Sequence, residues 1–233
     1  MKRDLFICAF TIVISLITCF IYSFINNPLS AEKIFMNSIT KVVEVKAITE
    51  EYGTSYGTGV LIDENATILT NAHVVSYQRM NINFDFEELS IRFAYEDEYR
   101  LCEIIKIDYE IDLAVMKIVE DENLEFDFFT MNENKILAGA TVYAIGNSNN
   151  FGIGITMGIC ASSSLTITYN NISRKVIQSD VYIASGNSGG ALVDSSGNLI
   201  GITTFKINDS NGDQIQGLCY SIAIEEILKF MEG

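Results

Sequence analysis

The chain has 233 residues, 48% of them hydrophobic, and a formal net charge of −15 at pH 7. Such a length accommodates an anchor and one substantial β domain, and it argues against a solenoid or a multidomain array. A negative surface repels phosphates and anionic lipid headgroups, which argues against nucleic acid as a partner. Solubility is the simpler role for this charge.

The N-terminus contains a long apolar segment. Residues 5–25 form 21 consecutive uncharged and mostly apolar positions, enough for a helix to cross the hydrocarbon core of a bilayer. We therefore predict a cytoplasmic N-terminus over 1–4, a transmembrane helix over 5–25 and a juxtamembrane link over 26–40. A cleavable signal peptide is the alternative, although its apolar region is usually shorter and ends in a small-x-small cleavage site.

Basic residues predict the orientation of this segment. Lys2 and Arg3 precede it, and the positive-inside tendency keeps such flanks in the cytoplasm. The expected location is the cell membrane, crossed once, with the remaining domain extracytoplasmic.

The cysteines and the single histidine leave little room for a metal. Outside the apolar segment lie Cys102, Cys160 and Cys219, an odd and widely spaced set that is not a disulfide framework, although one bridge stays open. With no Cys-x-x-Cys pair and one histidine, zinc has too few ligands. We expect no metal and no cofactor.

From residue 41 onward the sequence predicts one all-β domain that extends to residue 233. Short apolar, β-rich runs are separated by Gly, Asn and Asp, as in a barrel or a sandwich. These runs are 42–45, 59–62, 67–70, 113–116, 141–145, 158–160, 165–168, 176–178, 191–193 and 199–202. Helical spacing is expected only at 32–39 and, more clearly, at 222–231, which predicts a short C-terminal helix.

A serine surrounded by glycines is the first candidate for chemistry. Ser188 lies in Ser-Gly-Asn-Ser-Gly-Gly (185–190), where glycines allow a tight and sterically open turn. The backbone N–H groups of Gly186 and Ser188 are the candidate oxyanion hole for a tetrahedral intermediate. Taken alone, such a turn is more often an ordinary loop.

Two further residues complete the chemistry that a serine nucleophile needs. His73 follows a predicted strand and supplies a side chain whose ordinary pKa suits a general base. Asp112 opens a second apolar strand, where it is suited to accept the imidazole N–H and stabilise the imidazolium. A structural histidine and a solvated acid at a strand end are the plain alternatives for each residue taken separately.

Together these motifs resemble the protease domain of the HtrA (DegP/DegS-like) serine endopeptidases, within the chymotrypsin-like superfamily. The order histidine, aspartate, serine is that of the superfamily. The matching segments are 57–59, 70–75, 112–118, 144–147 and 178–193. The resemblance implies two six-stranded antiparallel β-barrels with the triad in the cleft between them, and peptide hydrolysis through an acyl-enzyme. It also implies polypeptide substrates. Members of the family often form homotrimers, but no contact signature in the sequence decides the oligomeric state.

The sequence departs from the family pattern near the nucleophile. Ser185 replaces a frequent proline, and this change is expected to loosen the turn. Asn187 occupies the place where trypsin has an aspartate that pairs with a freed N-terminus, so activation by N-terminal clipping is not expected. The sequence ends at Gly233 without the PDZ module typical of the family, so activation of this chain through such a module is not expected either.

The resemblance also predicts residues that contact the substrate. Tyr182 stands six positions before the nucleophile, where trypsin carries its specificity aspartate, so cleavage after Lys or Arg lacks a charged partner. With Ile183 it is expected to line an apolar pocket for Val, Ala, Leu or similar residues. Thr203 and Thr204 are expected to pair with the substrate backbone as an added strand.

Two functions are consistent with these features. The first is an endopeptidase that acts on unfolded or exposed segments of proteins. The alternative is a latent or inactive barrel scaffold that binds peptides or signals, because a fold does not guarantee an activity.

Overall fold

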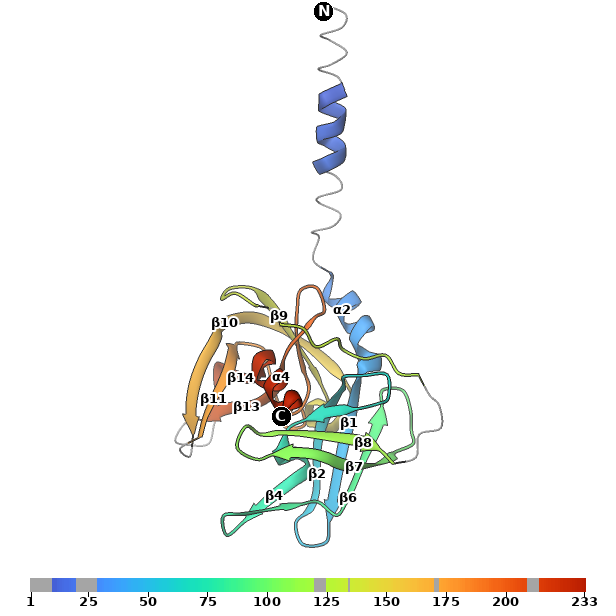
Figure 1. Cartoon of the computed structure of the whole chain (residues 1–233), viewed down its shortest axis with the longest axis vertical. Coiled ribbons are helices and arrows are strands. Elements are labelled where there is room, and N and C mark those ends of the chain that lie inside the picture. Colours follow the sequence, from blue (N-terminus) through green and yellow to red (C-terminus); the bar gives the residue numbers. More distant parts are fainter. Residues whose placement is uncertain (1–9, 20–28, 120–124, 134, 170–171, 209–213) are drawn as a thin grey trace, which may run out of the picture.

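The computed structural model describes residues 10–19, 29–119, 125–133, 135–169, 172–208 and 214–233. Two closed antiparallel barrels of six strands each form its body, which confirms the predicted architecture (Figure 1). The first barrel has the order β1-β2-β3-β8-β7-β6 and the second has the order β10-β11-β14-β13-β12-β9.

The first barrel contains β1 (Val42–Thr49), β2 (Gly53–Leu61), β3 (Ile68–Thr70), β6 (Glu88–Phe93), β7 (Arg100–Asp108) and β8 (Leu113–Ile118). A short helix, α3 (Ala72–Val75), and a hairpin of β4 (Ser76–Arg79) with β5 (Ile82–Asp85) connect β3 to β6. The hairpin and strands β6 and β7 were not among the predicted runs.

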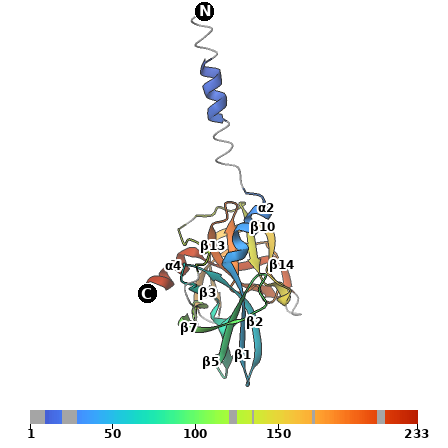
Figure 2. The ribbon, with the colours of Figure 1, turned by 90° about the vertical axis from the view of Figure 1, so that its right-hand side faces the viewer.

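The second barrel contains β9 (Thr141–Gly146), β10 (Gly154–Tyr169), β11 (Ile172–Ser179), β12 (Ala191–Asp194), β13 (Leu199–Asn208) and β14 (Gln214–Ala223). A 3-10 turn, η2 (Ser148–Asn150), separates β9 from β10. Before the barrels come α2 (Ala31–Ser38) and η1 (Ile39–Lys41), and after them comes α4 (Ile224–Glu232), the predicted C-terminal helix (Figures 1 and 2).

Strand alternation explains how the barrels pack. On β1, Val43, Val45 and Ala47 point into the first barrel, whereas Val42 points outward into a cluster shared by both barrels. This shared cluster also includes Ile34 of α2 and Ile227 of α4, both fully buried. Full burial of one such side chain stabilises the fold by about 1.5–3 kcal/mol, so this shared cluster helps to hold the two barrels together.

The N-terminal prediction falls largely on undescribed residues. Residues 10–19 are helical and all of them are exposed, whereas 1–9 and 20–28 lie outside the described residues. Across the described ranges, we find no helix with both the length and the apolar character required to traverse a bilayer.

The three cysteines of the barrel domain are buried and form no disulfide with one another, so the bridge that the sequence left open does not form among them. Burial raises the pKa of the Cys102 thiol to about 12. Because the thiolate is the reactive form, this cysteine is chemically inert at neutral pH.

Candidate active site

His73 lies on α3, directly after β3. Its neighbours Ala72, Val74 and Val75 are buried, whereas the His73 side chain is 49% exposed. The apolar residues therefore anchor the helix turn to the first barrel and leave the imidazole facing outward, where a substrate can reach it.

Asp112 occupies the turn between β7 and β8 with a left-handed backbone, φ +63°. Aspartate tolerates this conformation better than most residues because its short side chain bonds locally. The carboxylate accepts hydrogen bonds from the His73 backbone N–H at 3.0 Å, from His73 Nδ1 at 2.9 Å and from Thr204 Oγ1 at 2.8 Å. The Asp112 carbonyl accepts from Asn71 Nδ2 at 2.9 Å, which fixes the turn.

These contacts determine the charge of the Asp112 carboxylate. Burial by itself raises the pKa of Asp112, but the charge of His73 and the hydrogen bonds from His73 and Thr204 together lower it below its ordinary value. The carboxylate is therefore ionised at neutral pH and holds a proton on Nδ1 of His73. The opposite ring nitrogen, Nε2, is then the basic one, which is the tautomer required of a general base.

Hydrogen bonds to Thr204 connect Ser188 with Asp112, the partner of His73. The Ser188 hydroxyl donates to the Thr204 carbonyl at 3.0 Å, while the Thr204 hydroxyl donates to Asp112. Thr204 thus joins the serine turn of the second barrel to the histidine and aspartate of the first. Within the described chain, no hydrogen bond connects Ser188 with His73 directly.

The peptide between residues 185 and 186 is oriented by η2. The carbonyl of Ser185 accepts from the backbone N–H of Asn149 at 2.6 Å. Because a trans peptide points its C=O and N–H in opposite directions, the Gly186 N–H points away from η2. That N–H donates to no acceptor in the described chain. The Ser185 carbonyl is therefore fixed by a hydrogen bond, and the loosening of the turn expected from Ser185 stays a prediction.

The peptide between residues 187 and 188 is oriented by β13. The carbonyl of Asn187 accepts from Thr203 Oγ1 at 2.6 Å and from the Gly190 N–H at 2.9 Å. The Ser188 N–H consequently points the other way, and it too lacks an acceptor among the described residues. Two backbone donors beside the serine hydroxyl are therefore unoccupied.

Two glycines allow the turn to take this shape. Gly186 and Gly189 have φ of +91° and +85°. A Cβ at Gly186 would collide with the carbonyl of Asn147, and one at Gly189 would collide with the carbonyl of Thr58. These positions accept only glycine without rearrangement.

The other residues expected to contact substrate have different surroundings. Tyr182 is 58% exposed and its carbonyl accepts from Thr156 Oγ1 at 2.9 Å. Ile183 is buried in the interior of the second barrel. Thr203 is also buried, and its hydroxyl donates to the Asn187 carbonyl at 2.6 Å, with the Gly190 carbonyl farther away at 3.2 Å. Only Thr204 of this group contacts the triad.

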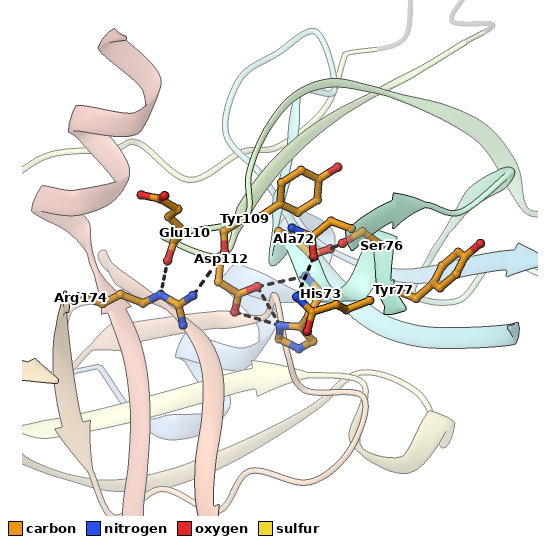
Figure 3. A pocket seen from close by; sticks show the side chains of 10 residues that line it. Ala72, His73, Ser76, Tyr77, Tyr109, Glu110, Asp112 and Arg174 are labelled. Carbon is orange, nitrogen blue, oxygen red and sulfur yellow. Dashed lines mark hydrogen bonds and ion pairs between the residues drawn. The ribbon is translucent and has the colours of Figure 1, made fainter. Parts of the chain in front are cut away.

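A cavity of about 370 Å³ lies beside His73 and Asp112 (Figure 3). Arg174, on β11 of the second barrel, reaches across it and donates to the Glu110 carbonyl at 2.5 Å and to the Tyr109 carbonyl at 3.4 Å. This arginine therefore ties the second barrel to the segment that precedes Asp112. Nothing in the local sequence marks it, since its partners lie 64 and 65 positions away.

Paired barrels of six antiparallel strands, with a serine, a histidine and an aspartate on the segments that connect the strands, are the architecture of a trypsin-like serine peptidase. The family model described as "Trypsin-like peptidase domain" matches residues 57–202. The serine endoprotease DegS of Escherichia coli (strain K12) is 34% identical over 181 residues, which cover 76% of this chain and 47% of DegS.

A probable periplasmic serine endoprotease, DegP-like, of Pseudomonas putida (strain GB-1) is 32% identical over 171 residues, covering 73% of this chain and 33% of that protein. A solved structure titled "HtrA-type protease AlgW with tripeptide" superposes with a TM-score of 0.71 at 29% identity, covering 88% of this chain and 63% of that one. The chain belongs to the trypsin-like peptidase family and, within it, to the HtrA-type serine proteases. It spans about half the length of DegS and a third of the DegP-like relative.

Proposed function

We propose that this protein is an endopeptidase that cleaves peptide bonds through an acyl-enzyme on Ser188. His73 removes the hydroxyl proton, Asp112 orients the imidazole, and the N–H groups of Gly186 and Ser188 stabilise the oxyanion of the tetrahedral intermediate. His73 then returns the proton to the leaving amine, and water attacks the ester in the same way. The observation that carries this proposal is the pair of unoccupied N–H groups beside a serine that shares Thr204 with the ionised Asp112.

The first step requires the Ser188 hydroxyl to turn from Thr204 toward His73. Rotation about one side-chain bond exchanges a single neutral hydrogen bond, worth about 0.5–1.5 kcal/mol net, for a bond to Nε2. It also releases the Thr204 carbonyl. Because a bulge interrupts the β13–β14 pairing between Thr203 and Phe205, we propose that this carbonyl accepts a backbone N–H of the substrate.

The substrates we propose are unfolded or exposed protein segments, cleaved after small or medium apolar residues. Extended segments are the ones that pair with a strand edge. In support of an apolar preference, a tyrosine, Tyr182, stands where trypsin has an acidic side chain, and the adjacent Ile183 is apolar.

Mapping the cut sites in a reduced and alkylated, permanently unfolded protein by mass spectrometry tests activity and preference together. We expect cuts mainly after Val, Ala and Leu, and covalent labelling of Ser188 by a fluorophosphonate. Predominant cleavage after Lys or Arg would contradict the proposed pocket. Absence of both cuts and labelling would contradict the proposed reaction.

A latent scaffold is the second candidate, favoured by the hydrogen bond that turns Ser188 toward Thr204 instead of His73. In a latent protein, binding of unfolded chains is unaffected by Ser188→Ala and no cleavage accompanies it. Cleavage by the wild-type protein alone would exclude this candidate.

We also propose that the N-terminal segment anchors the protein in the membrane, with the barrels on the extracytoplasmic side. Support comes from the helix at 10–19, whose apolar side chains are 46–64% exposed at Phe10, Ile12, Val13, Ile14, Leu16 and Ile17. Arginine near the middle of a membrane helix costs about 2.5–3.5 kcal/mol, so we expect Ile14→Arg with Leu16→Arg to shift the protein from the carbonate-resistant membrane fraction to the supernatant. Met36→Arg, on the exposed side of α2, is the control and stays with the membranes. Release of the wild-type protein by carbonate would contradict an anchor.

The homotrimer stays a prediction.

A further inference from the structure

Thr58 is a fully buried residue of the first barrel that bonds to the serine turn of the second. Its backbone N–H donates to the Ser188 carbonyl at 2.8 Å, and its hydroxyl donates to the Gly186 carbonyl at 2.6 Å. The same hydroxyl oxygen accepts from the Asn147 N–H at 2.9 Å. Thr58 therefore contacts both residues of the proposed oxyanion hole, Ser188 through its backbone and Gly186 through its side chain, and the side chain also contacts the loop that leads to η2.

The direction of these bonds is unambiguous. A hydroxyl carries a single proton, and a backbone N–H can only donate. Because Asn147 supplies a proton to the hydroxyl oxygen, the hydroxyl proton itself goes to the Gly186 carbonyl. The Thr58 carbonyl in turn accepts from Thr70 Oγ1 at 2.7 Å, which leaves Thr58 held from both sides.

This contact matters because of the glycine that it holds. Gly186 has φ of +91°, and a glycine can rotate its flanking peptides far more freely than other residues. The peptide between residues 186 and 187 is fixed by its carbonyl on Thr58 and, more weakly, by the Asn187 N–H on the Ala184 carbonyl at 3.2 Å. Without the hydroxyl, the shorter and buried bond of this pair is lost.

We propose that Thr58 is a positioning residue that sets, from the opposite barrel, the peptide orientation on which the oxyanion hole depends. This inference rests on the proposed function, because the hole is useful only if Ser188 attacks a carbonyl. Its consequence is that formation of the hole depends on how the two barrels are docked, and not on the serine turn alone.

The matched variants are Thr58→Val, which replaces the hydroxyl by a methyl of similar size, and Thr58→Ser, which keeps the hydroxyl. Misplacing a donor by about 1 Å lowers turnover about 10²-fold, so we expect Thr58→Val to lower kcat by roughly that factor with KM nearly unchanged. Thr58→Ser is expected to stay within about threefold of wild type. The control is Thr49→Val, at a buried threonine of the same barrel whose hydroxyl bonds to no described residue.

A second measurement does not depend on activity. In the ¹⁵N–¹H spectrum, the Gly186 and Ser188 amides are expected to shift or broaden in Thr58→Val, and to keep their wild-type positions in Thr58→Ser and Thr49→Val. An inactive wild-type protein with these spectral changes would overturn the proposed function and leave the positioning role standing.

Three results would overturn the positioning role. They are an unchanged Gly186 amide and kcat in Thr58→Val, a rise in KM with kcat unchanged, and a defect in Thr58→Ser as large as in Thr58→Val. Should Thr58→Val not fold, Thr58→Cys replaces it, because a thiol is a weak donor of similar size. Its expected loss in kcat is about tenfold, and a wild-type kcat in that variant would also overturn the proposal.

Discussion

Replacing Ser188 by alanine is expected to lower kcat for peptide hydrolysis by about 10⁶-fold, the scale on which removal of a serine nucleophile acts in this chemistry. The variant keeps His73, Asp112 and the two free N–H groups, but it has no atom that can form the acyl bond. It loses the hydrogen bond from Ser188 to the Thr204 carbonyl, so its free energy of unfolding should change by no more than about 1.5 kcal/mol. Initial rates on a quenched peptide and urea unfolding measure the two quantities.

The control for this prediction is Ser196→Ala. Ser196 is an exposed serine in the turn between β12 and β13, and its side chain makes no hydrogen bond to the described residues. We expect wild-type rates from it. If Ser188→Ala retained hydrolysis within tenfold of wild type, the nucleophile would have to be another group.

Asp112→Asn is expected to lower kcat by about 10⁴-fold while the fold stays intact, the magnitude known for this substitution in the serine-protease template. An amide N–H₂ facing Nδ1 of His73 favours the tautomer that carries its proton on Nε2. That nitrogen then cannot accept the Ser188 proton. Asparagine is also among the few residues that tolerate the backbone at this position, φ +63°, so the turn itself should persist.

The pH dependence separates this effect from simple loss of structure. Because the tautomer defect is relieved when hydroxide removes the serine proton directly, activity of Asp112→Asn should rise toward alkaline pH, whereas an unfolded variant would show no such rise. Asp63→Asn is the control, since Asp63 caps a surface turn by accepting from the N–H groups of Asn65 and Thr67. A loss smaller than tenfold in Asp112→Asn would show that His73 is oriented by other groups.

Much of the fold was predictable because strand signals are local. The runs assigned to β1, β8, β9 and β12 are buried on one or both faces, so their sequences are almost continuously apolar. The β4–β5 hairpin escaped prediction because each of its strands has only four residues and β5 is exposed along its whole length. Strand β7 alternates charged and apolar residues over a half-exposed surface, which also weakens the signal.

The candidate nucleophile, base and acid could be named from sequence for the same local reason. Each of them is recognisable from its immediate neighbours in the sequence: a serine among glycines, a single histidine after a strand and an aspartate at a strand end. The family resemblance supplied their order. Whether residues 5–25 cross a membrane was likewise inferred from sequence, and it stays a prediction.

Only the tertiary structure decided which residues hold that chemistry in place. Thr204 bonds to Asp112 across 92 positions, Arg174 bonds to the Glu110 carbonyl across 64, and Thr58 bonds to the Gly186 carbonyl across 128. These partners become neighbours because the two barrels dock through their shared apolar cluster, and no local sequence pattern predicts that docking. The sequence by itself determined which groups are the candidates for the reaction, because side-chain chemistry and turn geometry are local. Their alignment was decided by packing, because hydrogen bonds form only between groups that the whole fold brings within about 3 Å.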